Sequence, residues 1–337
     1  MPCSHNTEPG AWVALGPDPF LEMLVPLREE HRRRGDASLV AGNARNIERI
    51  LREIGNRQVK LLVVEDPADP SVRPQYHSPF LQRVDGPDVL LGWIRMNHAT
   101  LASYVWRMTA LLRRGDAPTQ PIVLLGPRER RYLDLIDELE KIATSTSELT
   151  TFRWTAERIR RAPMVDALRL GAAAVFYAGH GNVGGWLAYG GLGIEAFRGG
   201  GAWSNEHTNA LMFSLSCSAG RASSPEASKD ARLGLADGVT AHGAAGAVLA
   251  PVGDTLHENT RLLAGALVRA LADGRRGLRE ILAEARSEGA SLEGYVVIGD
   301  PALSAASAPG ALHRGETVSA PAPDADPAPT IAGASRH

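Results

Sequence analysis

Cysteine is scarce in this sequence: the chain has 337 residues and two cysteines, Cys3 and Cys217. So few cysteines exclude a disulfide-stabilised scaffold and any zinc or iron–sulfur site built from several cysteines. Three histidines, His180, His242 and His257, show no short ligand spacing with each other or with either cysteine. We therefore expect no bound metal, and no residue pattern indicates a cofactor.

Charge of one sign and long hydrophobic runs are also lacking. The 36 basic and 38 acidic residues give a net charge of −2, which argues against a dedicated nucleic-acid-binding protein. The longest apolar runs, such as residues 172–178, are too short to cross a bilayer. The first residues show no basic region followed by an apolar stretch, so no secretory signal is visible. We expect a cytoplasmic protein without nucleic-acid or membrane partners.

Proline and glycine are unevenly distributed and suggest the domain limits. Residues 1–17 are rich in Gly, Pro and polar side chains and are expected to form a loose arm. Residues 306–337 combine Pro, Ala, Ser and Asp without apolar periodicity, which predicts a disordered tail. A polar stretch at residues 113–120 separates an N-terminal lobe, 18–116, from a second lobe, 117–305.

Between these ends, apolar runs alternate with amphipathic segments. Strands are expected at residues 59–64, 89–91, 122–125, 172–177, 211–215, 247–249 and 295–298. Helices are expected at residues 20–34, 43–54, 98–112, 129–143, 262–271 and 278–288. Continuous apolar strands interleaved with helices predict an α/β fold, with mostly parallel strands flanked by helices on both faces.

Two of the expected strands end in residues that could carry chemistry. The sequence VFYAGHG places His180 and Gly181 after one strand, and LMFSLSCSAG places Cys217 after another. Neighbouring parallel strands lie about 5 Å apart, so the imidazole could take the proton of the thiol. The N–H groups of Gly181 and Cys217 could then form an oxyanion hole. Either residue alone would more often be structural, and the pair carries the hypothesis.

A competing motif overlaps the same residues. Residues 179–184 read G-x-G-x-x-G directly after a strand, which matches the dinucleotide-binding fingerprint. The following residues, GWLAYGG, do not predict the helix that would bind a pyrophosphate at its N-terminus. A nucleotide-binding α/β module therefore stays as an alternative, with less support than the His–Cys pair.

Several segments resemble the caspase-like (clan CD) cysteine peptidases, and most closely the gingipain-type group, peptidase family C25. The resemblance rests on VFYAGHGNVGGW, LMFSLSCSAG and the closing YVVIGDPAL, and it extends over residues 18–305. It implies a caspase-like fold in two similar lobes. It also implies that His180 is the general acid/base, Cys217 the nucleophile and the N–H groups of Gly181 and Cys217 the oxyanion hole. The reaction would be the hydrolysis of a polypeptide substrate through a thioester.

The chain departs from the family pattern where an acidic residue usually supports the histidine. Gly126 and Pro127 occupy that place, and the wall loop APVGDTLHEN lacks the family's pocket tryptophan. The candidate pocket residues are Arg128, Glu129, Arg130 and Trp186. The missing acid keeps open a catalytically silent caspase-like scaffold that binds a protein partner. An activating protein is a further candidate partner.

Overall fold

A computed structural model describes residues 10–54, 57–69, 71–83, 86–113, 121–146, 149–169, 171–198, 208–222 and 233–305. The expected tail at 306–337 and most of the expected boundary at 113–120 lie outside the described residues. In these ranges no helix is long and apolar enough to cross a membrane.

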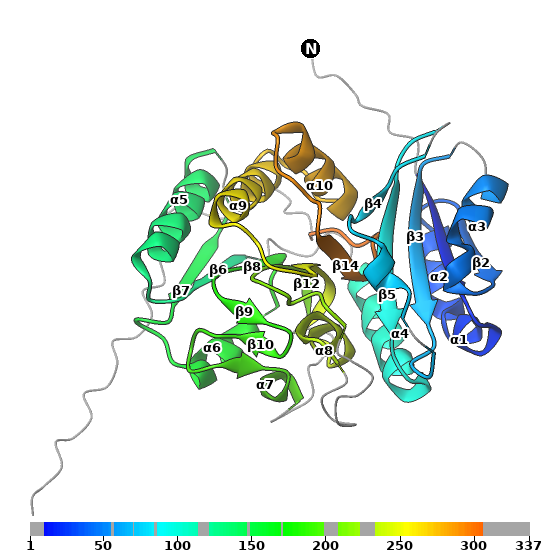
Figure 1. The fold of residues 1–337 in the computed structure, drawn as a ribbon, viewed down its shortest axis with the longest axis horizontal. Helices are drawn as coiled ribbons and strands as arrows, with labels where there is room; N and C mark the ends of the chain where they lie inside the picture. Colours follow the sequence, from blue (N-terminus) through cyan, green and yellow to red (C-terminus); the bar gives the residue numbers. More distant parts are fainter. Residues whose placement is uncertain are drawn as a thin grey trace, which may run out of the picture.

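Strands and helices alternate along the chain (Figure 1). The strands are β1 (Ala11–Gly16), β2 (Ala37–Ala41), β3 (Val59–Glu65), β4 (Phe80–Leu81), β5 (Val89–Arg95), β6 (Ile122–Gly126), β7 (Thr151–Thr155), β8 (Ala174–Ala178), β9 (Gly181–Asn182), β10 (Gly185–Trp186), β11 (Leu192–Gly193), β12 (Asn209–Leu215), β13 (Ala245–Pro251) and β14 (Tyr295–Gly299). The helices are α1 (Asp18–Met23), α2 (Val25–Arg32), α3 (Ile47–Ile54), α4 (His98–Arg113), α5 (Arg130–Thr146), α6 (Arg161–Leu168), α7 (Glu195–Arg198), α8 (Leu235–Ala241), α9 (His257–Ala272) and α10 (Leu278–Ser287), with 3-10 turns η1 (Ala44–Asn46) and η2 (Arg73–Gln75).

One sheet runs through the described part of the molecule. Its 11 strands follow the order β2-β1-β3-β5-β14-β13-β12-β8-β6-β7, with β4 paired to β5. All neighbours on the main path are parallel except β13 and β14, which are antiparallel. The sheet therefore has two arms of opposite strand direction, which meet where β13 pairs with β14 in the centre of Figure 1. By its direction β14 belongs to the first arm, although it lies in the segment 117–305 that was expected to form the second lobe. Because the direction reverses between β13 and β14, the carboxyl ends of the strands lie at opposite edges in the two arms.

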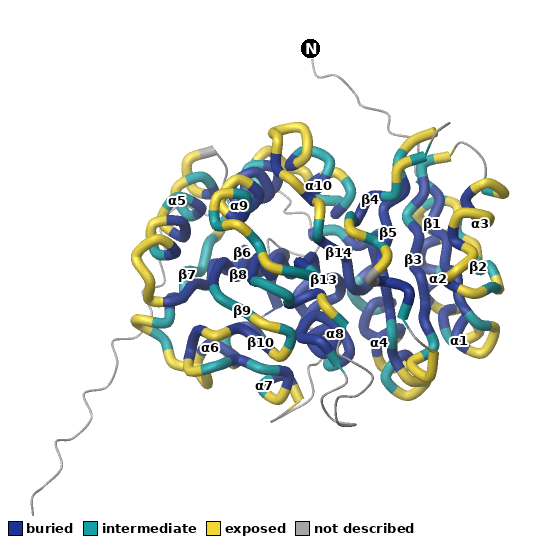
Figure 2. The backbone as a smooth tube through the Cα atoms, in the orientation of Figure 1, coloured by how far each residue is buried: buried dark blue, intermediate teal, exposed yellow. Residues whose placement is uncertain are grey.

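Helices cover both faces of this sheet, and each face has its own apolar core. Side chains of α1, α2, α4, α5, α9 and α10 pack on one face. Those of α3, α6, α7 and α8 pack on the other. Successive residues of a strand alternate between the two cores: in β8, Phe176 belongs to the first and Tyr177 to the second. Buried backbone accordingly follows the strands, and exposed backbone follows the outer helices (Figure 2). The predicted mostly parallel α/β fold is confirmed.

Two local predictions were wrong. Residues 11–16, assigned to a loose arm, form the buried strand β1 between β2 and β3. The single helix expected at residues 20–34 is interrupted at Leu24 and continues as α2. Pro26 lies at the start of α2 and has no N–H to donate to a carbonyl of the preceding turn, which explains the interruption.

Candidate active site

His180 and Cys217 follow two neighbouring strands of the second arm. β8 and β12 are parallel, and Ala178 pairs with Leu215 at their carboxyl ends. Each residue comes two positions after this pair, so the fold brings them to the same edge of the sheet. A Cβ added to Gly181 would lie 2.5 Å from Ser216 Oγ and 3.3 Å from the Cys217 carbonyl oxygen. The histidine segment therefore crosses directly over the cysteine segment, at a distance that only glycine permits.

Cys217 lies on a strained turn that is tied to the end of β13. The next residue, Ser218, has a positive φ of 57°, which is uncommon for a non-glycine residue. Its N–H donates to the Gly253 carbonyl at 2.8 Å, and Cys217 Sγ lies 3.8 Å from Thr255 Oγ1. The thiol is free and only partly buried. The turn thus presents a fixed, accessible sulfur at the edge of the sheet.

The backbone of His180 is fixed by two hydrogen bonds to its carbonyl oxygen. The Tyr177 hydroxyl donates to it at 2.8 Å, and the Leu187 N–H donates at 3.0 Å. The second bond belongs to the β9–β10 hairpin, in which Gly181 pairs with Trp186. Antiparallel pairs alternate between bonded and non-bonded, so the Gly181 N–H points away from β10. The Cys217 N–H donates to no group among the described residues. Both predicted oxyanion donors are therefore left open.

Two charged side chains from the start of α5 contact the imidazole of His180. Glu129 Oε1 lies 2.9 Å from Nε2, and Arg131 Nη2 lies 2.7 Å from the same nitrogen. Glu129 and Arg131 are also 3.2 Å from each other. The acid that the sequence seemed to lack beside the histidine is thus supplied by Glu129, three residues after Gly126. Glu129, expected from the sequence to line the substrate pocket, therefore contacts the histidine instead.

Tyr132 packs against this group from the same helix. Its ring meets the rings of His180 and His257 edge-on, with 5.3 Å between centroids in each pair. The Arg131 guanidinium lies 4.7 Å from the Tyr132 ring centre. Burial raises the pKa of Tyr132, with a further contribution from the Glu129 carboxylate and despite the opposing effect of Arg131. Tyr132 therefore remains neutral and serves as a wall beside His180.

The other expected pocket residues lie elsewhere. Arg128 donates to the Ala156 carbonyl at 3.0 Å, and Arg130, 88% exposed, pairs with Asp134 at 2.8 Å on the outer face of α5. Arg128 precedes α5, and Arg130 begins it and pairs with Asp134 one turn further along the helix. Trp186 is 1% exposed, so a pocket role was wrong for this conformation.

Trp186 instead holds the site together from beneath. Its ring stacks on Tyr177 with 4.2 Å between centroids, and its Nε1–H donates to Ser214 Oγ at 2.8 Å. Ser214 Oγ lies 3.2 Å from Ser216 Oγ, and Ser216 is the residue that packs against Gly181. The contacts of Arg131, Tyr132 and Thr255 with the site were not predicted from the sequence. The signal for the first two was present in the charged GPRERRY segment, but their direction depends on where α5 begins.

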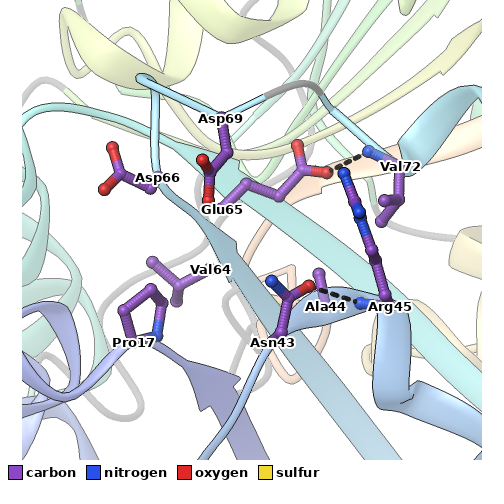
Figure 3. Close-up of a pocket in the computed structure, with 9 residues that line it drawn as sticks. All are labelled: Pro17, Asn43, Ala44, Arg45, Val64, Glu65, Asp66, Asp69 and Val72. Atoms are coloured by element: carbon purple, nitrogen blue, oxygen red, sulfur yellow. Dashed lines mark hydrogen bonds between the residues drawn. The ribbon is translucent and has the colours of Figure 1, made fainter.

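A separate pocket lies at the carboxyl ends of β1 and β3, in the first arm (Figure 3). Because the strand direction reverses at β14, this pocket lies at the edge opposite to His180 and Cys217. The carboxylate of Glu65 lines it but already accepts from Ser71 Oγ and from the N–H of Val72. Within the described residues, no group of three or more His, Cys, Asp or Glu is placed to hold a metal.

Comparison with known proteins supports the assignment of the fold and of the family. Residues 95–306 match peptidase family C25. A crystal structure of the Arg-specific cysteine proteinase gingipain R (RgpB) has 14% identity and a TM-score of 0.66, and the match covers 89% of this chain and 79% of that one. The complex of Porphyromonas gingivalis RgpB pro- and mature domains has 14% identity and a TM-score of 0.64, covering 87% and 79%. No curated protein matches the chain.

The family match and the gingipain-like fold define a cysteine-type peptidase. The chain belongs to peptidase family C25, and its domain is of the gingipain type. Its substrates are accordingly polypeptides.

Proposed function

We propose that this protein hydrolyses peptide bonds with Cys217 as nucleophile and His180 as general acid and base. The observation that carries the proposal is the close crossing of the His180 and Cys217 segments at Gly181. Next to this crossing, His180 contacts the carboxylate of Glu129. Glu129 accepts a hydrogen from Nε2, which orients the ring and leaves Nδ1 to exchange a proton with the thiol.

The reaction proceeds in two halves. His180 takes the proton of Cys217, and the thiolate attacks the carbonyl carbon to form a C–S bond. The N–H groups of Gly181 and Cys217 stabilise the negative oxygen. The imidazolium then protonates the leaving amine as the C–N bond breaks, which leaves a thioester. His180 next deprotonates a water molecule, whose oxygen attacks the thioester, and the acid product leaves as Cys217 regains its proton.

The two alternatives have less support. A silent scaffold was suggested by the absence of an acid beside His180, and Glu129 occupies that position at 2.9 Å. A nucleotide-binding module needs a helix after the G-x-G-x-x-G motif, and the chain forms the β9–β10 hairpin there. An activating protein partner stays a prediction; the RgpB complex of pro- and mature domains supports only that a similar fold can bind a protein partner.

An electrophilic, thiol-directed peptide probe tests the proposal without knowledge of the substrate. We expect the probe to label Cys217 in the wild type and to leave Cys3 unlabelled. Labelling should fall at least about 100-fold in His180→Ala, because the thiolate loses its partner. Arg130→Gln, on the outer face of α5, is the matched control and should be labelled like the wild type. Equal labelling of both cysteines, unaffected by His180→Ala, would reject the mechanism.

A further inference from the structure

A single ring nitrogen of His180 contacts two groups of opposite charge. Nε2 lies 2.9 Å from the Glu129 carboxylate and 2.7 Å from the Arg131 guanidinium. The side chains of these three residues are between 44% and 48% exposed, so each has room to move. Of the three cationic side chains at residues 128–131, only Arg131 contacts the histidine; Arg128 and Arg130 have other partners.

The two contacts make opposite demands on Nε2. A guanidinium only donates hydrogen bonds, so the contact with Arg131 requires a bare Nε2. A carboxylate only accepts, so the contact with Glu129 requires an Nε2–H. One nitrogen cannot satisfy both at the same time. The contacts therefore belong to two different protonation arrangements of the ring.

The remaining groups around His180 do not remove this conflict. Tyr132 from α5 meets the ring edge-on and stays neutral, since burial raises its pKa. His257 from α9 packs edge-on against Tyr132. The Tyr177 hydroxyl from β8 bonds to the backbone oxygen of His180, and Cys217 follows β12 beneath. Arg131 is thus the cation, and Glu129 the carboxylate, in contact with the ring.

We propose that Arg131 is a positioning residue that sets the protonation of His180 by competing with Glu129 for Nε2. The inference rests on the peptidase mechanism proposed above. With Arg131 on Nε2, the neutral ring carries its hydrogen on Nδ1 and cannot accept the proton of Cys217. With Glu129 on Nε2–H, Nδ1 is free to accept that proton, and the imidazolium is stabilised. Arg131 therefore holds the ring in a resting arrangement and disfavours the imidazolium.

The variants Arg131→Gln, Arg131→Lys and Glu129→Gln separate these effects, with Arg130→Gln as the matched control. The first readout is the dependence of kcat/KM on pH. We expect Arg131→Gln to move the acid limb to higher pH, because removing the neighbouring cation favours the imidazolium, which cannot accept the proton of Cys217. Glu129→Gln should move it in the opposite direction. Arg131→Lys retains the charge and should stay close to the wild type, as should Arg130→Gln.

The second readout is independent of turnover. The ¹⁵N signals of the His180 ring, followed by NMR in the Cys217→Ala background, report both the tautomer and the titration midpoint. We expect the Nδ1–H tautomer at high pH when Arg131 is present, and a higher midpoint in Arg131→Gln than in Arg130→Gln. An Arg131→Gln titration that coincides with that of Arg130→Gln overturns the inference. A wild type without turnover, but with the expected NMR shift, would reject the mechanism and keep the Arg131–His180 coupling.

Discussion

The site has no space for a side chain at Gly181. A Cβ there would lie 2.5 Å from Ser216 Oγ, far inside van der Waals contact. We expect Gly181→Ala to separate the histidine segment from Cys217 and to lower kcat at least about 100-fold, because catalysis is sensitive to displacements of about 1 Å.

The matched control is Gly184→Ala, in the same hairpin. Its added Cβ would meet Asn182 Oδ1 at 3.4 Å, an ordinary contact. Steady-state kinetics on both variants provides the comparison. Comparable kcat values for the two would show that the close crossing at Gly181 has no part in catalysis.

The charges beside His180 also affect which substrate residue is favoured immediately before the scissile bond. Glu129 already contacts both Arg131 and His180, and Arg131 adds a positive charge beside the ring. We expect fluorogenic peptides with Arg or Lys at this position to be cleaved at least about tenfold more slowly than matched peptides with a small neutral residue, because a cation there meets Arg131. A clear preference for Arg or Lys, lost in Glu129→Gln, would show instead that Glu129 recognises the substrate.

Among the elements, α8 connects the first arm of the sheet to the catalytic segments. The N–H groups of Leu235 and Ala236 donate to the carbonyls of Val183 and Ala219, which belong to the histidine and cysteine segments. The same helix carries Asp237, which forms two hydrogen bonds, of 2.7 and 2.8 Å, with Arg73 from η2. A buried ion pair therefore holds the helix that supports both catalytic segments.

Removing one partner of this pair leaves the other buried and unpaired, since Arg73 is 1% and Asp237 6% exposed. We expect Arg73→Met to lower the free energy of unfolding by about 3–5 kcal/mol. The double variant Arg73→Met/Asp237→Leu should recover much of this loss, because no uncompensated charge remains. Urea unfolding of the three proteins measures both effects. Full stability of Arg73→Met alone would contradict the role assigned to the pair.

The elements were predictable from sequence where the pattern was long and apolar. The runs that became β3, β8, β12 and β14 were recognised because each is continuous and buried on both faces. β1 was missed because AWVALG is short and is followed directly by Pro17. His180 and Cys217 were found because strand ends are fixed by the strands themselves. The contacts of Arg131 and Glu129 depend on the first turn of α5, which a residue pattern does not fix to within one residue.

For the whole molecule, β14 joins the two arms, and a buried polar cluster closes that junction. Asp300 directly follows β14 and is fully buried. Its carboxylate lies 2.7 Å from His31 Nε2 of α2 and accepts from Trp12 Nε1 of β1 at 3.0 Å. Burial alone would raise the pKa of Asp300, but His31 and the hydrogen bonds outweigh it, and the pKa is lowered. Folding thus favours the ionised carboxylate.

This pKa shift predicts how stability depends on pH. A carboxylate whose pKa is lower in the folded state contributes stability above its ordinary value of about 3.9, and that contribution is lost as the pH falls through the folded value. We expect the free energy of unfolding to fall below about pH 4 in the wild type. Asp300→Asn should be less stable at neutral pH and should show a weaker fall. Parallel acid profiles for the two proteins would contradict this account of the junction.

The central claim is that Cys217 and His180 act as one catalytic unit, and the turnover of a peptide library by single and double variants tests it most directly. We predict that Cys217→Ala and His180→Ala each lower kcat/KM at least ~10³-fold while leaving the unfolding transition intact. The double variant should have a kcat/KM no lower than that of the less active single variant, because neither residue is catalytic without the other. Turnover by Cys217→Ala at the wild-type rate would contradict the mechanism.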